Sequence, residues 1–266
     1  MKGIKYQING HQYFIRFRYF NNKIVKCFLS DEDFKTVFVG IETTSIDGLL
    51  ECNKIQNTKA DLLESVKKIQ SYGLEVQAGF IVGLDSDDPS KIFQELIEFI
   101  RKSGIVTAMV GLLQAPTKTK LWIRMKETNR LKGNMSGDNG DGTTNIIPKM
   151  DIKILLEGYK KIISEIYDPK VYYKRIITHV FNLDRVEIKP KPFVKPKFYT
   201  SDFKALVLSF IYQGIISKER KYYWEMVFKI FFNRPKYFAH AITLAIYGRH
   251  YYLWMKSIVS RTTQIA

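Results

Sequence analysis

The segment from residue 36 to residue 43, Thr-Val-Phe-Val-Gly-Ile-Glu-Thr, constrains the fold of this chain more than any other. It is short, apolar and rich in β-branched residues, and polar residues bound it, which is typical of a buried strand. Strands of this kind occur in parallel sheets that helices cover. Ligands bind at the carboxyl ends of such strands, so Glu42 lies where cofactor binding is expected. The alternative is that Glu42 only caps the helix that follows.

Strands and helices alternate after this segment. Ser45 predicts the start of a short helix that ends near Cys52, and Thr58 predicts the start of a longer helix that Gly73 ends. The alternation predicts a parallel sheet with right-handed crossover connections, although three units are too few for a closed barrel. The elements expected next are a strand over 74–83, a helix over 89–103, a strand over 106–113 and a helix over 121–131.

The flanking parts of the chain are different in kind. Residues 13–29 predict a hairpin with Asn21-Asn22 at its turn. Residues 133–145 form a polar loop whose Gly, Asn and Asp residues suit tight turns, and its spacing favours a surface or lid loop over a calcium site. From Asp151 onward the pattern is helical, with a stiff basic linker over 189–197. Helices are expected from Asp151, from Asp168 and over 201–217, 219–232 and 235–259; the scattered His179, His240 and His250 do not indicate a metal site.

Composition limits the setting and the partners. The chain has 266 residues, two cysteines (Cys27 and Cys52) and no apolar N-terminal signal, so a cytoplasmic location with free thiols is expected. Much of its net charge of +16 lies after residue 188, where there are 14 Lys and Arg and only 3 acidic residues. Such a tail predicts binding to nucleic acid, to an anionic membrane surface or to an acidic partner protein, or else it is a plain solvated face. There is no specific nucleic-acid motif and no segment of the length that spans a membrane.

Three strand ends and one loop carry a family resemblance. The strand ends are Val39-Gly40-Ile41-Glu42-Thr43, Gly79-Phe80-Ile81-Val82-Gly83 and Gly111-Leu112-Leu113-Gln114-Ala115-Pro116, and the loop runs from Asn134 to Met150. Together they resemble the last three strands of the radical SAM partial barrel, in the cobalamin-binding-domain subfamily that has a helical C-terminal domain. The resemblance implies an α/β fold: a partial parallel (β/α) barrel fragment of about three β-α units followed by an all-α domain. The divisions expected are 1–34 (unmatched), 35–132 (half barrel) and 133–266 (loop and helical domain).

The resemblance also implies a cofactor site. In that family S-adenosylmethionine lies across the carboxyl ends of the strands. By resemblance Glu42 and Thr43 face its polar part, and Gly83 lets the backbone approach closely. The cofactor-binding residues implied are Glu42, Thr43, Ile81, Val82, Gly83, Leu113 and Gln114.

The sequence departs from the family in its cysteines. A radical SAM enzyme holds its [4Fe–4S] cluster on three cysteines, usually spaced Cys-x3-Cys-x2-Cys, and this chain has only Cys27 and Cys52. The cobalamin domain expected upstream is also absent. We therefore expect the C-terminal part of such an enzyme, truncated or split, inactive alone and partnered by a separately encoded N-terminal half, with an unknown small-molecule substrate. The alternative is a non-catalytic interaction protein that uses its basic helical tail to bind a partner protein or an anionic membrane surface.

Overall fold

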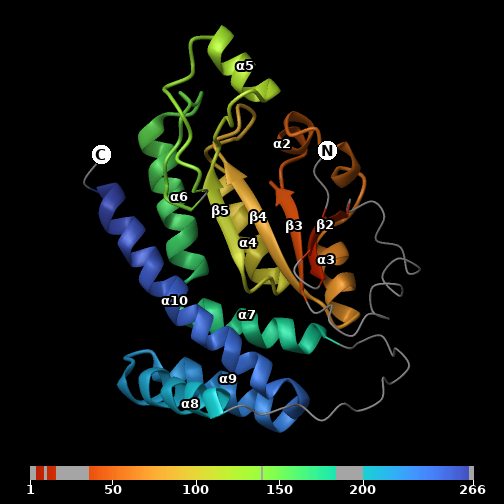
Figure 1. Cartoon of the computed structure of the whole chain (residues 1–266), viewed down its shortest axis with the longest axis vertical. Coiled ribbons are helices and arrows are strands. Elements are labelled where there is room, and N and C mark those ends of the chain that lie inside the picture. Colours follow the sequence, from red (N-terminus) through yellow and green to blue (C-terminus); the bar gives the residue numbers. More distant parts are fainter. Residues whose placement is uncertain (1–3, 9–10, 16–35, 139, 184–199, 264–266) are drawn as a thin grey trace.

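The computed structural model describes residues 4–8, 11–15, 36–138, 140–183 and 200–263. Within them lies a sheet with the strand order β2-β1-β3-β4-β5, in which β3, β4 and β5 are parallel and β1 is antiparallel to both of its neighbours. Helices alternate with the parallel strands, and a helical region follows them, so the predicted α/β class is confirmed (Figure 1). The strands are β1 (Ile4–Ile8), β2 (His11–Ile15), β3 (Thr36–Glu42), β4 (Glu75–Val82) and β5 (Ala108–Leu112).

The helices follow the predicted order. The α-helices are α2 (Ile46–Glu51), α3 (Leu62–Ser71), α4 (Ile92–Ser103), α5 (Lys120–Glu127), α6 (Ile152–Ile166), α7 (Pro169–Asn182), α8 (Thr200–Ser209), α9 (Arg220–Asn233) and α10 (Phe238–Thr263). The shorter elements are the 3-10 turns η2 (Ile55–Asn57) and η4 (Pro235–Tyr237) and the π-helix η3 (Phe210–Ile216). In the parts of the chain that the structure describes, no helix is long and apolar enough to cross a membrane.

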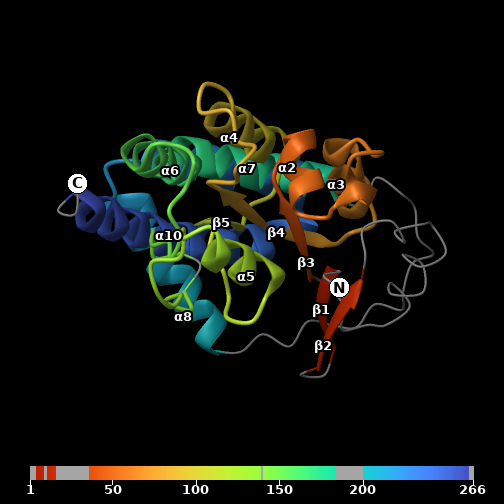
Figure 2. The same ribbon diagram turned by 90° about the horizontal axis from the view of Figure 1, so that it is seen from above.

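The two faces of the parallel strands differ in burial. On β3 every second side chain, at Val37, Val39 and Ile41, is almost fully buried. This follows from the period of two in a strand, which sends alternate side chains to opposite faces. Figure 2 shows α3 and α4 on one side of the sheet, and their apolar side chains share one core with the buried strand positions. The other face is less covered: Met109 on β5 is 48% exposed.

Two predicted boundaries were wrong for local reasons. The helix expected from Thr58 begins at Leu62 instead, because the Thr58 hydroxyl donates to the carbonyl of Ile55 and completes the turn η2. Asp61 is the N-cap, and its carboxylate accepts from the backbone N–H of Glu64. The single helix expected over 201–217 is divided into α8 and the π-helix η3.

A hairpin of β1 and β2 lies N-terminal to most of the one expected over 13–29. The strand β2 overlaps the expected first arm only at residues 13–15, and its partner is β1, which precedes it in the chain. The expected turn and second arm, like Cys27 and the basic linker, lie outside the described residues. The strand β1 also pairs with β3 through Lys5 and Phe38, so the edge of β3 that the sequence left without a neighbour is partly paired.

Candidate functional site at the carboxyl ends of the parallel strands

The three parallel strands end at one edge of the sheet. In the register of the sheet Gly40 lies beside Gly79, and Val82 lies beside Leu112. The strands point toward α5 in Figure 1, and the predicted site residues are within or directly after their last residues. The topology therefore brings all of the predicted positions to one edge, as expected for a parallel sheet.

Glu42 has an unusual backbone conformation, and its side chain is paired with Lys54. Its φ is 71°, and the register between β3 and β4 shifts between Gly40 and Glu42. Lys54 Nζ lies 3.2 Å from Glu42 Oε1 and also donates to the carbonyl of Gly40 at 3.1 Å. The carboxylate lies over Gly40, where an added Cβ would be 2.7 Å from Oε1. The glycine is therefore needed for the carboxylate to take this position.

Glu42 does not cap the next helix. The N-cap of α2 is Ser45, whose hydroxyl accepts from the backbone N–H of Gly48. Thr43 supports the same turn, because its hydroxyl accepts from the N–H of Ser45 at 3.2 Å and its side chain is fully buried. The alternative that Glu42 only caps the next helix is thus wrong. Thr43 stabilises this turn, and any contact with a cofactor would be additional to that role.

Strand alternation separates the predicted residues of β4. Val82 is fully buried on the helix-covered face, whereas Ile81 is partly buried and packs against a small apolar cluster. Two consecutive strand residues point to opposite faces, so their side chains cannot line one pocket together. The neighbour of Ile81 on β5 is Gly111, which leaves space beside it. That small cluster consists of Leu84, Leu113, Ala115, Met125 and Ile146, with Cys52, Ile81, Leu121, Trp122 and Leu131 packed against it.

The loop after β4 is ordered by two carboxylates that the sequence reasoning missed. Asp87 Oδ2 accepts from the backbone N–H of Gly83 at 2.8 Å and of Leu84 at 3.0 Å, and Gly83 has a φ of 93°. Burial raises the pKa of Asp87 to about 6, although the two N–H donors oppose the shift. Glu51 accepts from the backbone N–H groups of Asp85 and Ser86.

Gln114 ties the downstream loop to the end of β5. Its Nε2 donates to the carbonyls of Thr143 at 3.0 Å and Asp138 at 3.3 Å, while its Oε1 is buried with no hydrogen-bond partner in the described structure. Leu113 contributes its carbonyl, which accepts from the Thr144 hydroxyl at 2.6 Å. The loop over 133–145 therefore folds against the carboxyl end of β5. Gln114 offers one unpaired acceptor there.

Asp85 and Arg130 fasten the segment after α5 to the same edge. The guanidinium donates to both carboxylate oxygens, at 2.6 Å and 2.7 Å, and Arg130 Nε donates to the carbonyl of Ile147. The two-pronged contact with Arg130 lowers the pKa of Asp85 below its ordinary value. Polar contacts thus hold three segments against the carboxyl edge: the loop after β4, the segment after α5 and the loop over 133–145.

The residues at this edge do not fit an iron–sulfur cluster. Cys52 is the described cysteine, and burial together with the nearby Glu42 and Glu51 raises the pKa of its thiol to about 12. Cluster ligands are thiolates, and this thiol stays protonated at neutral pH. Within the described ranges no three His, Cys, Asp or Glu side chains are grouped to hold a metal ion. The edge can instead accept hydrogen bonds from a ligand, because the Glu42 carboxylate and Gln114 Oε1 are acceptors.

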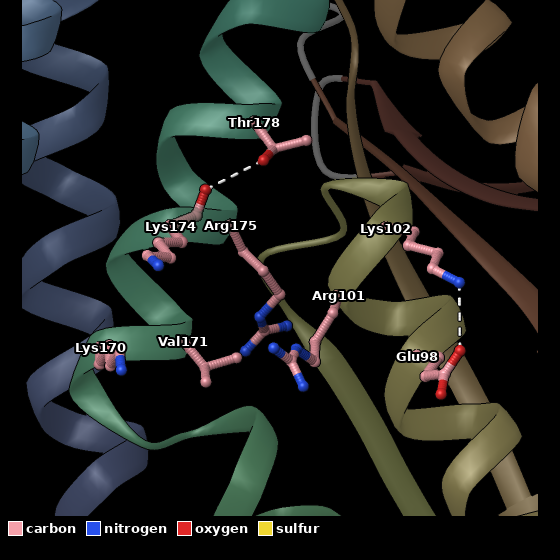
Figure 3. Close-up of a pocket in the computed structure, with 8 residues that line it drawn as sticks. All are labelled: Glu98, Arg101, Lys102, Lys170, Val171, Lys174, Arg175 and Thr178. Atoms are coloured by element: carbon pink, nitrogen blue, oxygen red, sulfur yellow. Dashed lines mark hydrogen bonds and ion pairs between the residues drawn. The ribbon is translucent and has the colours of Figure 1, made fainter.

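A separate groove of about 460 Å³ lies between α4 and α7. Figure 3 shows Arg101 and Arg175 reaching into the same space, with Lys170 and Lys174 on the rim. Arg175 is almost fully buried and donates to the carbonyls of Ile105, Val106 and Ile166. Its role is therefore to join the helical region to the sheet. The groove is a basic surface above that joint and not part of the carboxyl edge.

The structure defines the class of protein: an α/β sheet whose parallel strands end at one edge, followed by a helical region. Residues 119–264 match the family described as "Domain of unknown function (DUF4070)", and the chain belongs to that family. It is homologous to the "Uncharacterized methyltransferase sll1242" of Synechocystis, with 31% identity over 262 residues, which cover 94% of this chain and 47% of that protein.

A second relative is the "Hopanoid C-2 methylase" of Rhodopseudomonas palustris, with 36% identity over 142 residues. These cover 53% of this chain and 26% of that protein. The chain thus spans about half the length, or less, of the curated relatives it matches. No solved structure matches it.

Proposed function

We propose that this chain provides the C-terminal part of a radical SAM methyltransferase: three strands of the partial barrel and the helical domain. The observation that supports this most strongly is the alignment of 94% of the chain with 47% of a longer protein named as a methyltransferase. The sequence resemblance to radical SAM strand ends agrees with it. An N-terminal part, in the same polypeptide or a separate one, would supply the cysteines and the cobalamin domain.

In this proposal the carboxyl edge binds S-adenosylmethionine. Glu42 and Gln114 Oε1 are acceptors, and the cofactor carries donors in its ammonium, ribose hydroxyl and adenine amino groups. Lys54 holds the Glu42 carboxylate in place and limits its conformations before binding. Thr43, Val82 and Leu113 would contribute through backbone atoms, because the contacts of their side chains are structural. Gly83 has no side chain and would also contribute through its backbone.

The cofactor supplies a radical and a methyl source only when a cluster and cobalamin are bound. The described residues do not fit a cluster, so their part in the reaction is to bind and orient the cofactor. The substrate stays unassigned, and a cytoplasmic location belongs to the proposal. The exposed aromatic side chains of α9 favour the second candidate function, binding through the basic helical region, which concerns attachment and not catalysis.

The test joins this chain to a matching N-terminal half and measures S-adenosylmethionine binding by calorimetric titration. A charge-assisted hydrogen bond contributes about 1.5–3 kcal/mol, so Glu42→Gln should weaken binding roughly 10- to 100-fold. The matched control is Glu127→Gln, an exposed carboxylate on α5. Equal affinities for the parent and Glu42→Gln would show that Glu42 serves only its ion pair with Lys54, and the proposed site would then be wrong.

A further inference from the structure

The outward face of α9 carries large aromatic side chains that are exposed at the surface. The exposed fractions of Phe228, Phe231 and Phe232 are 54%, 52% and 75%. Clusters of exposed apolar side chains mark surfaces that bind another protein or a membrane. We therefore expect the outer face to bind a partner. The inward face is already filled by Tyr223, Met226, Val227 and Ile230, which are buried in the core.

The exposed aromatic side chains of α9 form one continuous surface. The ring centroids of Trp224 and Phe228 are 5.4 Å apart, those of Phe228 and Phe232 are 6.5 Å apart, and those of Phe231 and Phe232 are 5.4 Å apart. The π-helix η3 adjoins this row, because a Cβ on Gly214 would lie 3.0 Å from Trp224. We call the combined surface the aromatic face; it consists of Ile215, Ile216, Trp224, Phe228, Phe231 and Phe232.

Basic residues outnumber acidic ones on α9 and the segments beside it, and Lys221 and Lys229 of α9 are exposed. Residues 217–237 contain six Lys and Arg against two Glu. Lys229 and Arg234 both lie over the ring of Phe181, at 5.9 Å and 5.5 Å from its centroid, and Lys221 lies 4.8 Å from that of Tyr222. Long basic side chains of this kind cover apolar surface with their stems and keep their charges in water.

We propose that the aromatic face binds the surface of an anionic lipid bilayer. Exposed Phe and Ile side chains suit the boundary between headgroups and acyl chains, and the nearby cations suit anionic headgroups. A second copy of the chain suits the face less well, because symmetric pairing would bring the same basic side chains together. Figure 1 places α8 and α9 at one end of the molecule, where a flat surface can reach them. This proposal does not depend on cofactor binding.

The test is flotation of the full chain with vesicles of phosphatidylcholine alone or with 30 mol% phosphatidylglycerol, a composition chosen because each nearby cation adds about 1 kcal/mol on an anionic surface. We expect binding to the anionic vesicles that weakens with salt. The double variant Phe231→Ser/Phe232→Ser should lower it by roughly 30-fold or more, since two phenyl groups lose their apolar burial. Lys229→Gln should lower it about fivefold. The control is Ile123→Ser on α5, which is 46% exposed and lies toward the other end.

Tryptophan fluorescence gives a second readout that does not depend on the fold of a serine variant. Anionic vesicles should shift the emission of Trp224 to shorter wavelength, and the shift should disappear in Trp224→Phe and persist in Trp122→Phe. Three results would overturn the proposal. The chain could bind neutral and anionic vesicles equally at high salt, or the double variant could bind anionic vesicles as well as the parent does. The third result is a stable dimer that the double variant dissociates, with no binding to any vesicle.

Discussion

Replacing the buried Arg175 should destabilise the protein through loss of the joint between its helical region and its sheet. The guanidinium donates to the carbonyl of Ile105 at 2.7 Å, to that of Val106 at 3.3 Å, and closely to that of Ile166 at the end of α6. It also lies over the rings of Tyr167 and Tyr172, at 5.6 Å and 5.3 Å from their centroids. Arg175→Met keeps much of the side-chain volume but provides no donor.

The expected magnitude follows from these contacts. Each buried acceptor that loses its donor costs about 1–3 kcal/mol, and the acceptors at Ile105 and Ile166 have the closer contacts. Burial of the guanidinium opposes this, since it lowers the pKa of Arg175 and marks an unfavourable desolvation that methionine removes. The net loss in free energy of unfolding should therefore be roughly 2–4 kcal/mol. Arg175→Lys should lose nearly as much, because an ammonium cannot reproduce the planar fork.

Urea unfolding followed by circular dichroism measures this loss. With a slope of about 2–3 kcal/mol per molar, the midpoint should fall by roughly 1–2 M. The matched control is Lys174→Met, one position earlier on α7, where the side chain is exposed and the change should stay within about 0.5 kcal/mol. If Arg175→Met unfolds at the same urea concentration as Lys174→Met, the three carbonyls have other donors and the assigned role is wrong.

Three further predictions concern the carboxyl edge. The pKa of Asp87 in the folded chain is raised from 3.8 to about 6. Ionisation of Asp87 should therefore lower the free energy of unfolding by about 2–3 kcal/mol as the pH rises from about 4 to 6. Asp87→Asn should lack this decrease when unfolding is compared at pH 4 and pH 8. Gly40→Ala should cost about 1–2 kcal/mol by displacing the Glu42 carboxylate, and less in a Glu42→Ala background; equal costs in both backgrounds would contradict the packing. Cys52 is partly buried and has a pKa raised to about 12. In a Cys27→Ser variant it should therefore react with a thiol reagent at pH 8 much more slowly in the folded chain than in the unfolded chain, and equal rates would contradict the raised pKa.

The sequence predicted the parallel strands well because their signals are local. The strand expected over 36–43 is β3, and the N-caps at Ser45, Asp151 and Asp168 are all confirmed. The errors arose where two local signals compete. Thr58 could begin a helix or complete a turn, and the contact with Ile55 decided for the turn. Nothing in local periodicity distinguishes a π-helix from an α-helix.

The candidate site was only partly predictable. The strand ends identified the edge, but the partner of Glu42 lies 12 positions later, at Lys54, and only the folded chain brings the two together. One restriction on the site was available from the sequence: Ile81 and Val82 are consecutive on one strand, so their side chains face opposite ways. The contacts of Asp87 depend on burial that its polar neighbours in the sequence did not indicate.

The two proposals involve opposite ends of the molecule, and this makes them separable. The strands point toward α5, whereas the aromatic face lies on η3 and α9 at the far end (Figure 1). A chain attached through α9 would therefore keep the carboxyl edge directed away from the bilayer, where a water-soluble cofactor can reach it. It follows that Phe231→Ser/Phe232→Ser should weaken vesicle binding and leave cofactor affinity in the joined protein unchanged. Glu42→Gln should weaken cofactor binding and leave vesicle binding unchanged. A variant at one end that altered both would mean that the helical region transmits changes to the sheet, and Arg175, which contacts both, would be the first residue to test.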